Sequence, residues 1–304
     1  MEILTLILLP IISMAVAFFT SPTGVSGAFL LLPFQVSVLN FVSPSVSATN
    51  LVYNLIAIPS GVYRYIREDR MAWPIASITI LATLPGVFIG AHLRVKYFFD
   101  PKLFKFFVGL VLLYLGLRVL YSVVRPSKAA KELEKKFKER VREIRKERSK
   151  MLVSGLSSEA TVKTKRIGLK KIEYEFWGET FSFPPIPLFL ISFAIGVIGG
   201  IYGIGGGAIL APILTSIFNL PIYTIAGATL LGTFLTSAFG IPVYYSLSYP
   251  PDWKIGIALG IGGFFGMYLG ARFQKFLPER IIRLCLSVIV LATSANYILQ
   301  LAFW

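Results

Sequence analysis

Residues 199–212 read GGIYGIGGGAILAP, and six of the first nine positions are glycine. Inside a helix each glycine costs about 1 kcal/mol relative to alanine. The cluster nevertheless lies between two strongly apolar stretches, where an unbroken helix would be the most favourable backbone. The cluster therefore predicts a break in a helix that is otherwise apolar on both sides.

The same pattern occurs earlier in the chain. At an offset of 179 residues, TSPTGVSGAFLLLP (20–33) aligns with the glycine-rich stretch. Two further pairs follow, because SATNLVYNLI (47–56) matches AGATLLGTFL (226–235) and, with one inserted residue, PGVFIGA (85–91) matches FGMYLGA (265–271). Agreement of glycine and proline positions over this length indicates an internal duplication. The matched positions are Gly24 with Gly203, Gly27 with Gly206 and Pro33 with Pro212.

The composition is that of a polytopic membrane protein. The 304 residues are 55% hydrophobic and 15% charged, and the mean hydropathy is +0.73. No acidic residue interrupts an apolar run. The net charge of +15 falls largely in one linker and in short loops, which favours contact with membrane lipids over binding of nucleic acid. The single cysteine, Cys285, excludes an intramolecular disulfide.

The chain divides into a first repeat (1–124), a basic cytoplasmic linker (125–185) and a second repeat (186–304). Each repeat contains five apolar segments, so the two copies should have opposite orientations in the membrane. We therefore predict an all-α polytopic protein, an inverted repeat of two five-segment halves with broken or re-entrant helices at the glycine clusters. The segments are 3–19, 25–42, 45–63, 72–91 and 104–124, then 186–202, 204–218, 222–246, 253–271 and 281–303.

Positive charges predict the orientation. With the N-terminus outside, 24 of the 30 lysines and arginines lie inside and five outside, which also puts the C-terminus outside. We expect a multi-pass protein of the cell membrane. Within the linker, the spacing of apolar residues predicts a helix over 128–150, and the alternation in 172–177 predicts a short strand. A connector between the copies is the simpler interpretation of the linker, with a regulatory domain as the alternative.

A broken helix inside a membrane is tolerated where it lines a cavity or is buried in protein. The half-helix after such a break begins with unpaired N–H groups and the positive end of its dipole, which together favour an anion. Close packing is the alternative interpretation of the glycines. It applies to Ala82, Gly86 and Gly90 and to Gly262, Gly266 and Gly270, which recur every four residues.

Uncharged polar residues should converge on the breaks and donate hydrogen bonds to the same anion. The spans lack carboxylates that could relay protons, so a small anionic substrate fits better than a cation. A proton or sodium ion could be coupled to it, and we expect no metal site and no cofactor. The predicted substrate-binding residues are Gly24, Ser26, Gly27, Thr49, Asn50, Asn54, Gly203, Gly205, Gly206, Gly207, Thr229 and Thr233, with Thr23 as a further candidate.

The chain resembles the sulfite exporter TauE/SafE family of membrane permeases. The residues that carry the resemblance are GIYGIGGGAILAPIL (200–214), SPTGVSGAFLLLPF (21–34), AGATLLGTFLTSAFG (226–240) and the GxxxGA endings of both fourth segments. The resemblance covers both repeats and leaves out the linker. It implies export of sulfite, sulfoacetate or a related sulfur-containing organic anion, driven by an ion gradient. The first copy departs from the motif at Pro22, Thr23 and Ser26.

Two other function classes remain as alternatives. Gly24 to Gly27 read GxSG, and His92 ends a GAH sequence, so Ser26 and His92 could form the dyad of a rhomboid-like intramembrane serine protease. The duplication already explains these glycines, and the second copy has neither residue. A passive anion channel is the other alternative, whereas we expect a transporter and not an enzyme.

Overall fold

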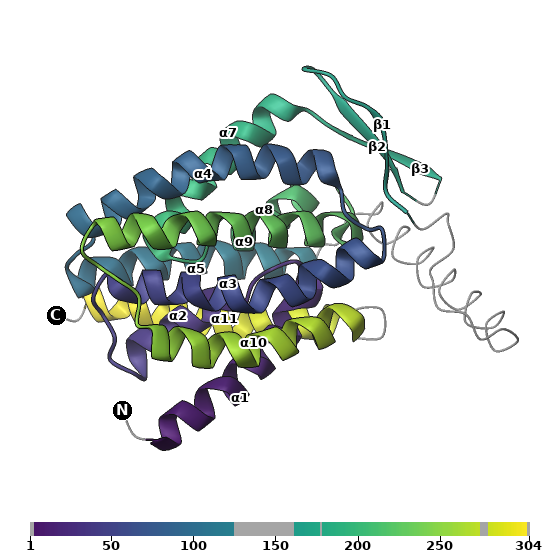
Figure 1. Cartoon of the computed structure of the whole chain (residues 1–304). Coiled ribbons are helices and arrows are strands. Elements are labelled where there is room, and N and C mark those ends of the chain that lie inside the picture. The colour runs from purple at the N-terminus through teal and green to yellow at the C-terminus, as the bar shows by residue number, and fades with distance from the viewer. Residues whose placement is uncertain (1–2, 125–160, 177, 274–278, 303–304) are drawn as a thin grey trace, which may run out of the picture.

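The structure is a computed structural model that describes residues 3–124, 161–176, 178–273 and 279–302, and Figure 1 shows it as a long helical bundle with a small sheet at one end. The first half contains α1 (Ile3–Thr20), a 3₁₀ turn (Ser21–Thr23), α2 (Ala28–Ser37), α3 (Ser45–Arg67), α4 (Trp73–Lys96) and α5 (Pro101–Val124). The second half contains α7 (Pro185–Tyr202), α8 (Gly207–Ser216), α9 (Ile222–Ser246), α10 (Trp253–Phe273) and α11 (Glu279–Ala302).

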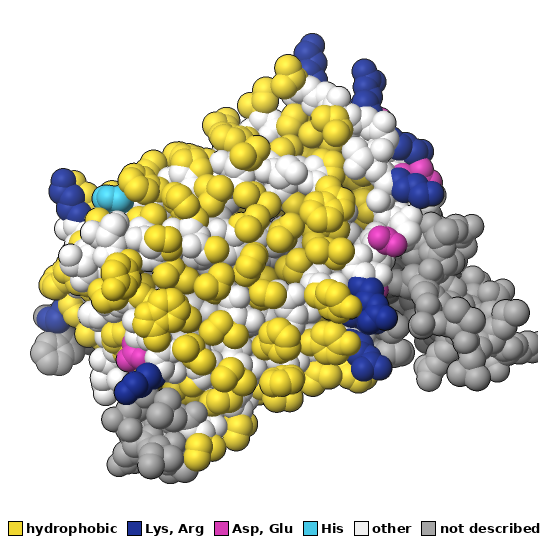
Figure 2. Space-filling model, viewed as in Figure 1, with side chains coloured by type: hydrophobic (Ala, Val, Ile, Leu, Met, Phe, Trp, Pro, Cys, Tyr) yellow, Lys and Arg dark blue, Asp and Glu magenta, His cyan; other side chains and the backbone are white. Residues whose placement is uncertain are grey.

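The helices suit a bilayer in length and composition. In the described part of the chain, five of them are long and apolar enough to cross a membrane: Trp73–Lys96, Pro101–Tyr121, Pro185–Tyr202, Ile222–Ser246 and Trp253–Phe273. On the face seen in Figure 2, apolar side chains cover the middle, and lysines and arginines gather toward the two ends. This distribution is what a hydrocarbon layer flanked by headgroups selects.

Two helix pairs are packed so closely that only glycine fits at the contacts. In α4, a Cβ on Gly86 would lie 2.5 Å from the Phe193 carbonyl of α7. In α10, a Cβ on Gly270 would lie 2.5 Å from the Phe18 carbonyl of α1. These contacts confirm that the glycines repeating every four residues in both fourth segments serve close packing. Figure 1 shows the two pairs on opposite sides of the bundle.

The contacts also give the relative directions of the helices. Residue numbers rise together along α1 and α10 and along α4 and α7, so each pair is parallel. The same holds for α3 with α10 and for α4 with α9, whereas α3 and α9 are antiparallel, because Leu51 meets Gly240 and Tyr65 meets Gly227. Consequently α3 runs opposite to α9, and α4 runs opposite to α10.

The central pair, α3 and α9, contains the most buried polar residues of the bundle. Asn50, Asn54, Thr229 and Thr233 are all fully buried. Because the helix backbones satisfy their own hydrogen bonds, polar side chains in such a position need partners outside their own helix or must bond to its carbonyls. Both solutions occur, and the first involves the two helix breaks.

The second apolar segment of each half is only partly helical. Helices α2 and α8 have ten residues each, which gives a length of about 15 Å, half the thickness of the hydrocarbon layer. The prediction of broken helices at both glycine clusters is confirmed. The non-helical residues before each half-helix lead the chain back from the end of α1 or α7 into the bundle, since Gly27 lies against Val16 and Tyr53.

The linker forms more regular structure than we predicted. The strand expected at 172–177 is present as β2 (Ile172–Phe176), but it is the middle strand of an antiparallel sheet with β1 (Lys163–Arg166) and β3 (Glu179–Phe183). The alternation in ETFSF would have indicated the third strand. The predicted helix at 128–150 lies outside the described residues.

Candidate anion site between two helix breaks

Both helix breaks contain glycine in a left-handed conformation. Gly24 has φ +70° and ends the 3₁₀ turn, and Gly203 has φ +79° and ends α7. Any other residue would be strained at these angles, since a Cβ clashes with the backbone there. A Cβ on Gly203 would also lie 2.5 Å from the backbone of Ser47. Glycine is therefore required at both positions to turn the chain sharply.

Asn50 of α3 connects the two breaks. Its side-chain amide donates to the carbonyl of Ala28, at the start of α2, and to the carbonyl of Gly203, both at 3.0 Å. Gln35 of α2 donates in turn to the Asn50 side-chain oxygen at 3.2 Å. One asparagine thus satisfies carbonyls from segments that are 175 positions apart in the sequence, and the breaks lie side by side.

Asn54, one helical turn further along α3, makes a second connection. It donates to the carbonyl of Ile204 at 3.2 Å and accepts a hydrogen bond from the Ser26 hydroxyl. The Ser26 oxygen also accepts the N–H of Ala28 at 3.2 Å. Asn50 and Asn54 are therefore the residues of α3 that hold the first break against the second.

Two threonines of α9 occupy the matching positions on the other side. Thr229 donates to the carbonyl of Gly24 at 3.0 Å, and Thr233 donates to the carbonyl of Thr229 at 2.9 Å. The Thr233 hydroxyl lies directly over Gly207, where a Cβ would collide with it. Asn50, Asn54, Thr229 and Thr233 do converge on the breaks, but their donors are bonded to backbone carbonyls of the protein.

The donors that remain are backbone amides. In the described structure, no hydrogen bond is made by the N–H groups of Val25 and Ser26 or by those of Gly205, Gly206 and Gly207. An unpaired amide away from water costs free energy comparable to a lost hydrogen bond. Two short helices begin at these amides, so their dipoles add positive potential at the same place. The arrangement can bind an anion through the main chain.

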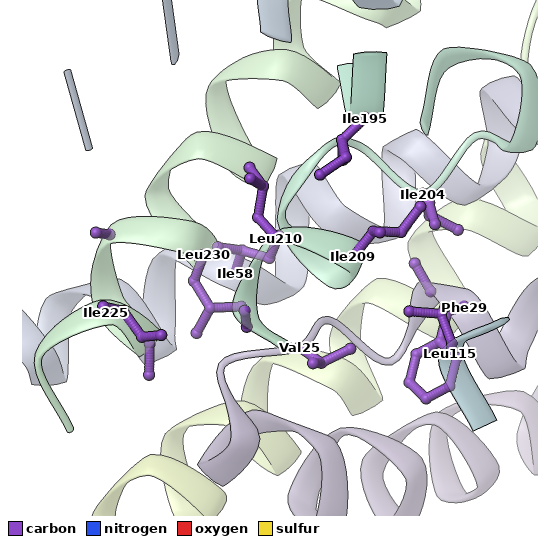
Figure 3. Packing of buried hydrophobic residues seen from close by; sticks show 14 of the residues in the cluster. Val25, Phe29, Ile58, Leu115, Ile195, Ile204, Ile209, Leu210, Ile225 and Leu230 are labelled. Carbon is purple, nitrogen blue, oxygen red and sulfur yellow. The ribbon is translucent and has the colours of Figure 1, made fainter. Parts of the chain in front are cut away.

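In this conformation the neighbouring helices close over both breaks. A Cβ on Gly206 would lie 2.6 Å from the Thr83 methyl of α4, and one on Gly27 would lie 2.6 Å from the Tyr53 hydroxyl. Figure 3 shows apolar side chains of both breaks, Val25 and Ile204 among them, within one buried cluster. The glycines thus contribute to close packing as well, and the site is occluded from solvent.

Comparison with known proteins identifies the family of this chain. A model of the sulfite exporter TauE/SafE family matches residues 9–297, nearly the whole chain. The chain belongs to the sulfite exporter TauE/SafE family. A curated protein of Bacillus subtilis (strain 168), "Probable membrane transporter protein YunE", is 20% identical over 262 residues, which cover 85% of this chain and 82% of that protein. No solved structure matches the chain.

The family resemblance found in the glycine motifs is therefore confirmed. The chain is a TauE/SafE membrane transporter, and its apolar helices agree with a multi-pass integral membrane protein. The match spans both halves and the linker between them.

Two of the predicted site residues, Thr49 and Thr23, form hydrogen bonds elsewhere and do not join the two breaks. Thr49 donates to the Ser45 carbonyl and accepts the N–H of Asp252, both at 2.8 Å, so it joins the start of α3 to the loop before α10. Thr23 bonds to the Thr20 carbonyl at 2.7 Å at the end of α1. The position of Thr49 one residue before Asn50 places it on a different side of the helix.

The dyad of the protease alternative is not assembled. Ser26 is fully buried and bonded to Asn54. His92 is on the exposed side of α4, where its ring packs against Phe88 and bonds to the Phe88 carbonyl at 2.9 Å. A serine nucleophile needs its base within hydrogen-bonding reach, and Asn54 cannot act as one.

Sequence reasoning missed two polar residues next to the breaks. Gln35 is fully buried in α2, and its side-chain oxygen has no hydrogen-bond partner among the described residues. Thr83 of α4 lies over Gly206. The signal for Gln35 was its polarity within the apolar run AFLLLPFQV (28–36), whereas Thr83 became visible only once α4 was placed beside the second break.

Proposed function

We propose that this TauE/SafE transporter moves a small sulfur-containing oxyanion, such as sulfite or an organosulfonate, out of the cell by alternating access. The observation that carries the proposal is the pair of half-helices α2 and α8, which begin beside each other next to the unpaired amides of the two breaks. Each half-helix contributes about half a positive charge at its N-terminus. The name of the family supplies sulfite as the first substrate to test.

The lack of side-chain charge at the breaks supports an anion over a cation. The buried polar residues around the breaks are asparagine, glutamine, serine, threonine and tyrosine, and none is an acid. Main-chain amides bind oxyanions without bringing a permanent positive charge into the membrane. Such a site can release its substrate, because the attraction comes from dipoles and hydrogen bonds and not from a full ion pair.

The alternating mechanism draws support from the paired helix contacts. Corresponding helices run in opposite directions, and the first helix of each half packs along the fourth helix of the other. We infer from these directions that the two halves form an inverted repeat, the arrangement in which a central site can open to either side with similar movements. The occluded breaks would correspond to the intermediate state between the two openings.

The test is anion binding and flux with purified protein. Thermal unfolding should shift upward with sulfite or an organosulfonate and not with matched chloride, because a ligand that binds only the folded protein stabilises it. In proteoliposomes, sulfite flux should saturate and show counterflow, and imposed proton or sodium gradients will identify the coupling ion. Flux that never saturates would support the passive anion channel instead, and the absence of any oxyanion effect would overturn the proposal.

A further inference from the structure

Arg94 is a fully buried cation near the end of α4, away from the helix breaks. Its exposed fraction is 0%, and it is the largest of the fully buried side chains. Its guanidinium lies over the ring of Phe104, 3.6 Å from the ring centre to the central carbon. A buried charge of this kind is unfavourable unless an opposite charge accompanies it.

No such opposite charge accompanies Arg94 in the described structure. Among the described residues Arg94 forms no ion pair, although Asp100 and Asp252 belong to loops at the same end of the bundle. Two of its nitrogens donate to backbone carbonyls, Nη1 to Phe98 and Nη2 to Val42, the latter at 3.2 Å. The Nε–H is buried and has no hydrogen-bond partner among the described residues. Since a guanidinium has five N–H donors, the two bonds leave it capable of binding an oxyanion as well.

Polar side chains lie between Arg94 and the second break. Tyr244 of α9 packs in one apolar cluster with Ala91 and Val95, which flank Arg94 on α4, and its hydroxyl donates to the carbonyl of Gly200 at 2.7 Å. Ser47 of α3 donates to the carbonyl of Ile201 at 3.3 Å and packs directly against Gly203. Polar groups of Tyr244 and Ser47 therefore connect the neighbourhood of Arg94 to the glycine break that ends α7.

We propose that Arg94 is a second anion-binding site, which binds a small oxyanion at the end of the bundle where α4 ends and passes it to the break at Gly203. The two loops whose carbonyls it holds, at Val42 and Phe98, cover it in the occluded state. Movement of these loops exposes the guanidinium, and the oxyanion then replaces one or both carbonyls. The identity of the anion as a sulfur oxyanion rests on the proposed function, but the existence of the site does not.

A purely structural role is the alternative, because Arg94 also ties two loops together. Protection from chemical modification distinguishes the two roles in the wild-type protein. Phenylglyoxal, which reacts with exposed guanidinium groups, should modify Arg94 during transport cycling, and sulfite or sulfate should slow that modification at least several-fold while acetate does less. Mass spectrometry of the digested protein locates the modified residue. Modification that no oxyanion slows, or a complete lack of modification, would overturn the proposal.

Substitution provides the second measurement. Arg94→Gln should raise the sulfite KM by about tenfold or more, as expected for loss of a charge-assisted hydrogen-bonding group, with a smaller effect on kcat. The KM of Arg94→Lys should lie between that of the wild type and that of Arg94→Gln, because lysine keeps the charge but lacks the planar set of donors of a guanidinium. Lys96→Gln, at an exposed lysine of the same helix end, is the control and should leave KM unchanged.

These measurements separate the two proposals. Unchanged KM in a folded Arg94→Gln protein overturns the Arg94 site and leaves the central site standing. If the wild type carries no sulfite while sulfate still protects Arg94 from phenylglyoxal, the proposed substrate is wrong and the Arg94 site is supported.

Discussion

The side-chain amide of Asn50 donates to the carbonyl of Gly203 across 153 residues of sequence, at 3.0 Å. This bond joins the second turn of α3, in the first half, to the left-handed turn that ends α7, in the second half. Because Gly203 has left its own helix, its carbonyl would otherwise be buried without a partner. The stability of the second break therefore depends on a residue of the first half.

Replacing Asn50 tests this dependence. Asn50→Leu removes the donor to both Ala28 and Gly203 and should lower the free energy of unfolding by about 2–4 kcal/mol, since buried carbonyls left unpaired cost about 1–3 kcal/mol each. Sulfite flux should fall with it. Thermal unfolding and proteoliposome flux measure the two effects. Ser77→Ala, which removes an exposed hydroxyl on α4, is the control and should change stability and flux little. If Asn50→Leu changes them as little as this control does, the structural role of the bond is refuted.

The second prediction separates packing from substrate binding at Gly206. Gly206→Leu should abolish transport in protein that still inserts, and Gly206→Ala should also impair it, because its Cβ would lie 2.6 Å from the Thr83 methyl. Adding Thr83→Ala removes that methyl. The double variant should regain thermal stability but not flux, since the new methyl still covers the amides of the break. Full recovery of flux would show that close packing is the only function of this glycine.

Thr233 provides a third prediction. Thr233→Val keeps the shape of the side chain but removes the hydroxyl that faces Gly207 and donates to Thr229 at 2.9 Å. If that hydroxyl turns to the bound anion, the loss should weaken anion binding by about 1.5–3 kcal/mol, the value for a hydrogen bond to a charged group. Titration of sulfite monitored by calorimetry would measure it. Thr293→Val on the exposed side of α11 should leave binding unchanged, and equal affinities for both variants would count against a role for Thr233.

The fourth prediction concerns the sheet of the linker. The hydroxyls of Tyr174 and Thr224 are hydrogen-bonded at 2.9 Å, and both residues are fully buried. Burial raises the pKa of Tyr174, so the phenol stays neutral and able to donate at physiological pH. Tyr174→Phe should lower the free energy of unfolding by about 0.5–1.5 kcal/mol.

A double-mutant cycle checks that this bond is responsible for the effect. Thr224→Val should lower the free energy of unfolding by a similar amount. The double variant should lower it by less than the sum of the two single effects, because both substitutions remove the same bond. Strict additivity would mean that the sheet is held in place by its apolar residues alone, such as Ile172 and Phe176, which are buried beside Tyr174.

The sequence by itself determined the helical segments and the two breaks, because both follow from local properties of the chain. Apolar length sets the spans, and glycine is the residue that tolerates the positive φ found at Gly24 and Gly203. The duplication also paired Asn50 with Thr229 and Asn54 with Thr233 before any contact was known. The membrane class and the TauE/SafE family followed from the same residues.

Only the tertiary structure decided how these polar groups are used. Hydrogen-bond partners such as Asn50 and Gly203 are set by helix packing over long sequence separations, which a local pattern does not encode. In the described part of the chain, packing turned Thr49 toward Asp252, buried Arg94 without an ion pair and left amides of the breaks as the available donors. The physical reason is that burial removes water, so each polar group must take whichever partner the neighbouring helices bring within reach.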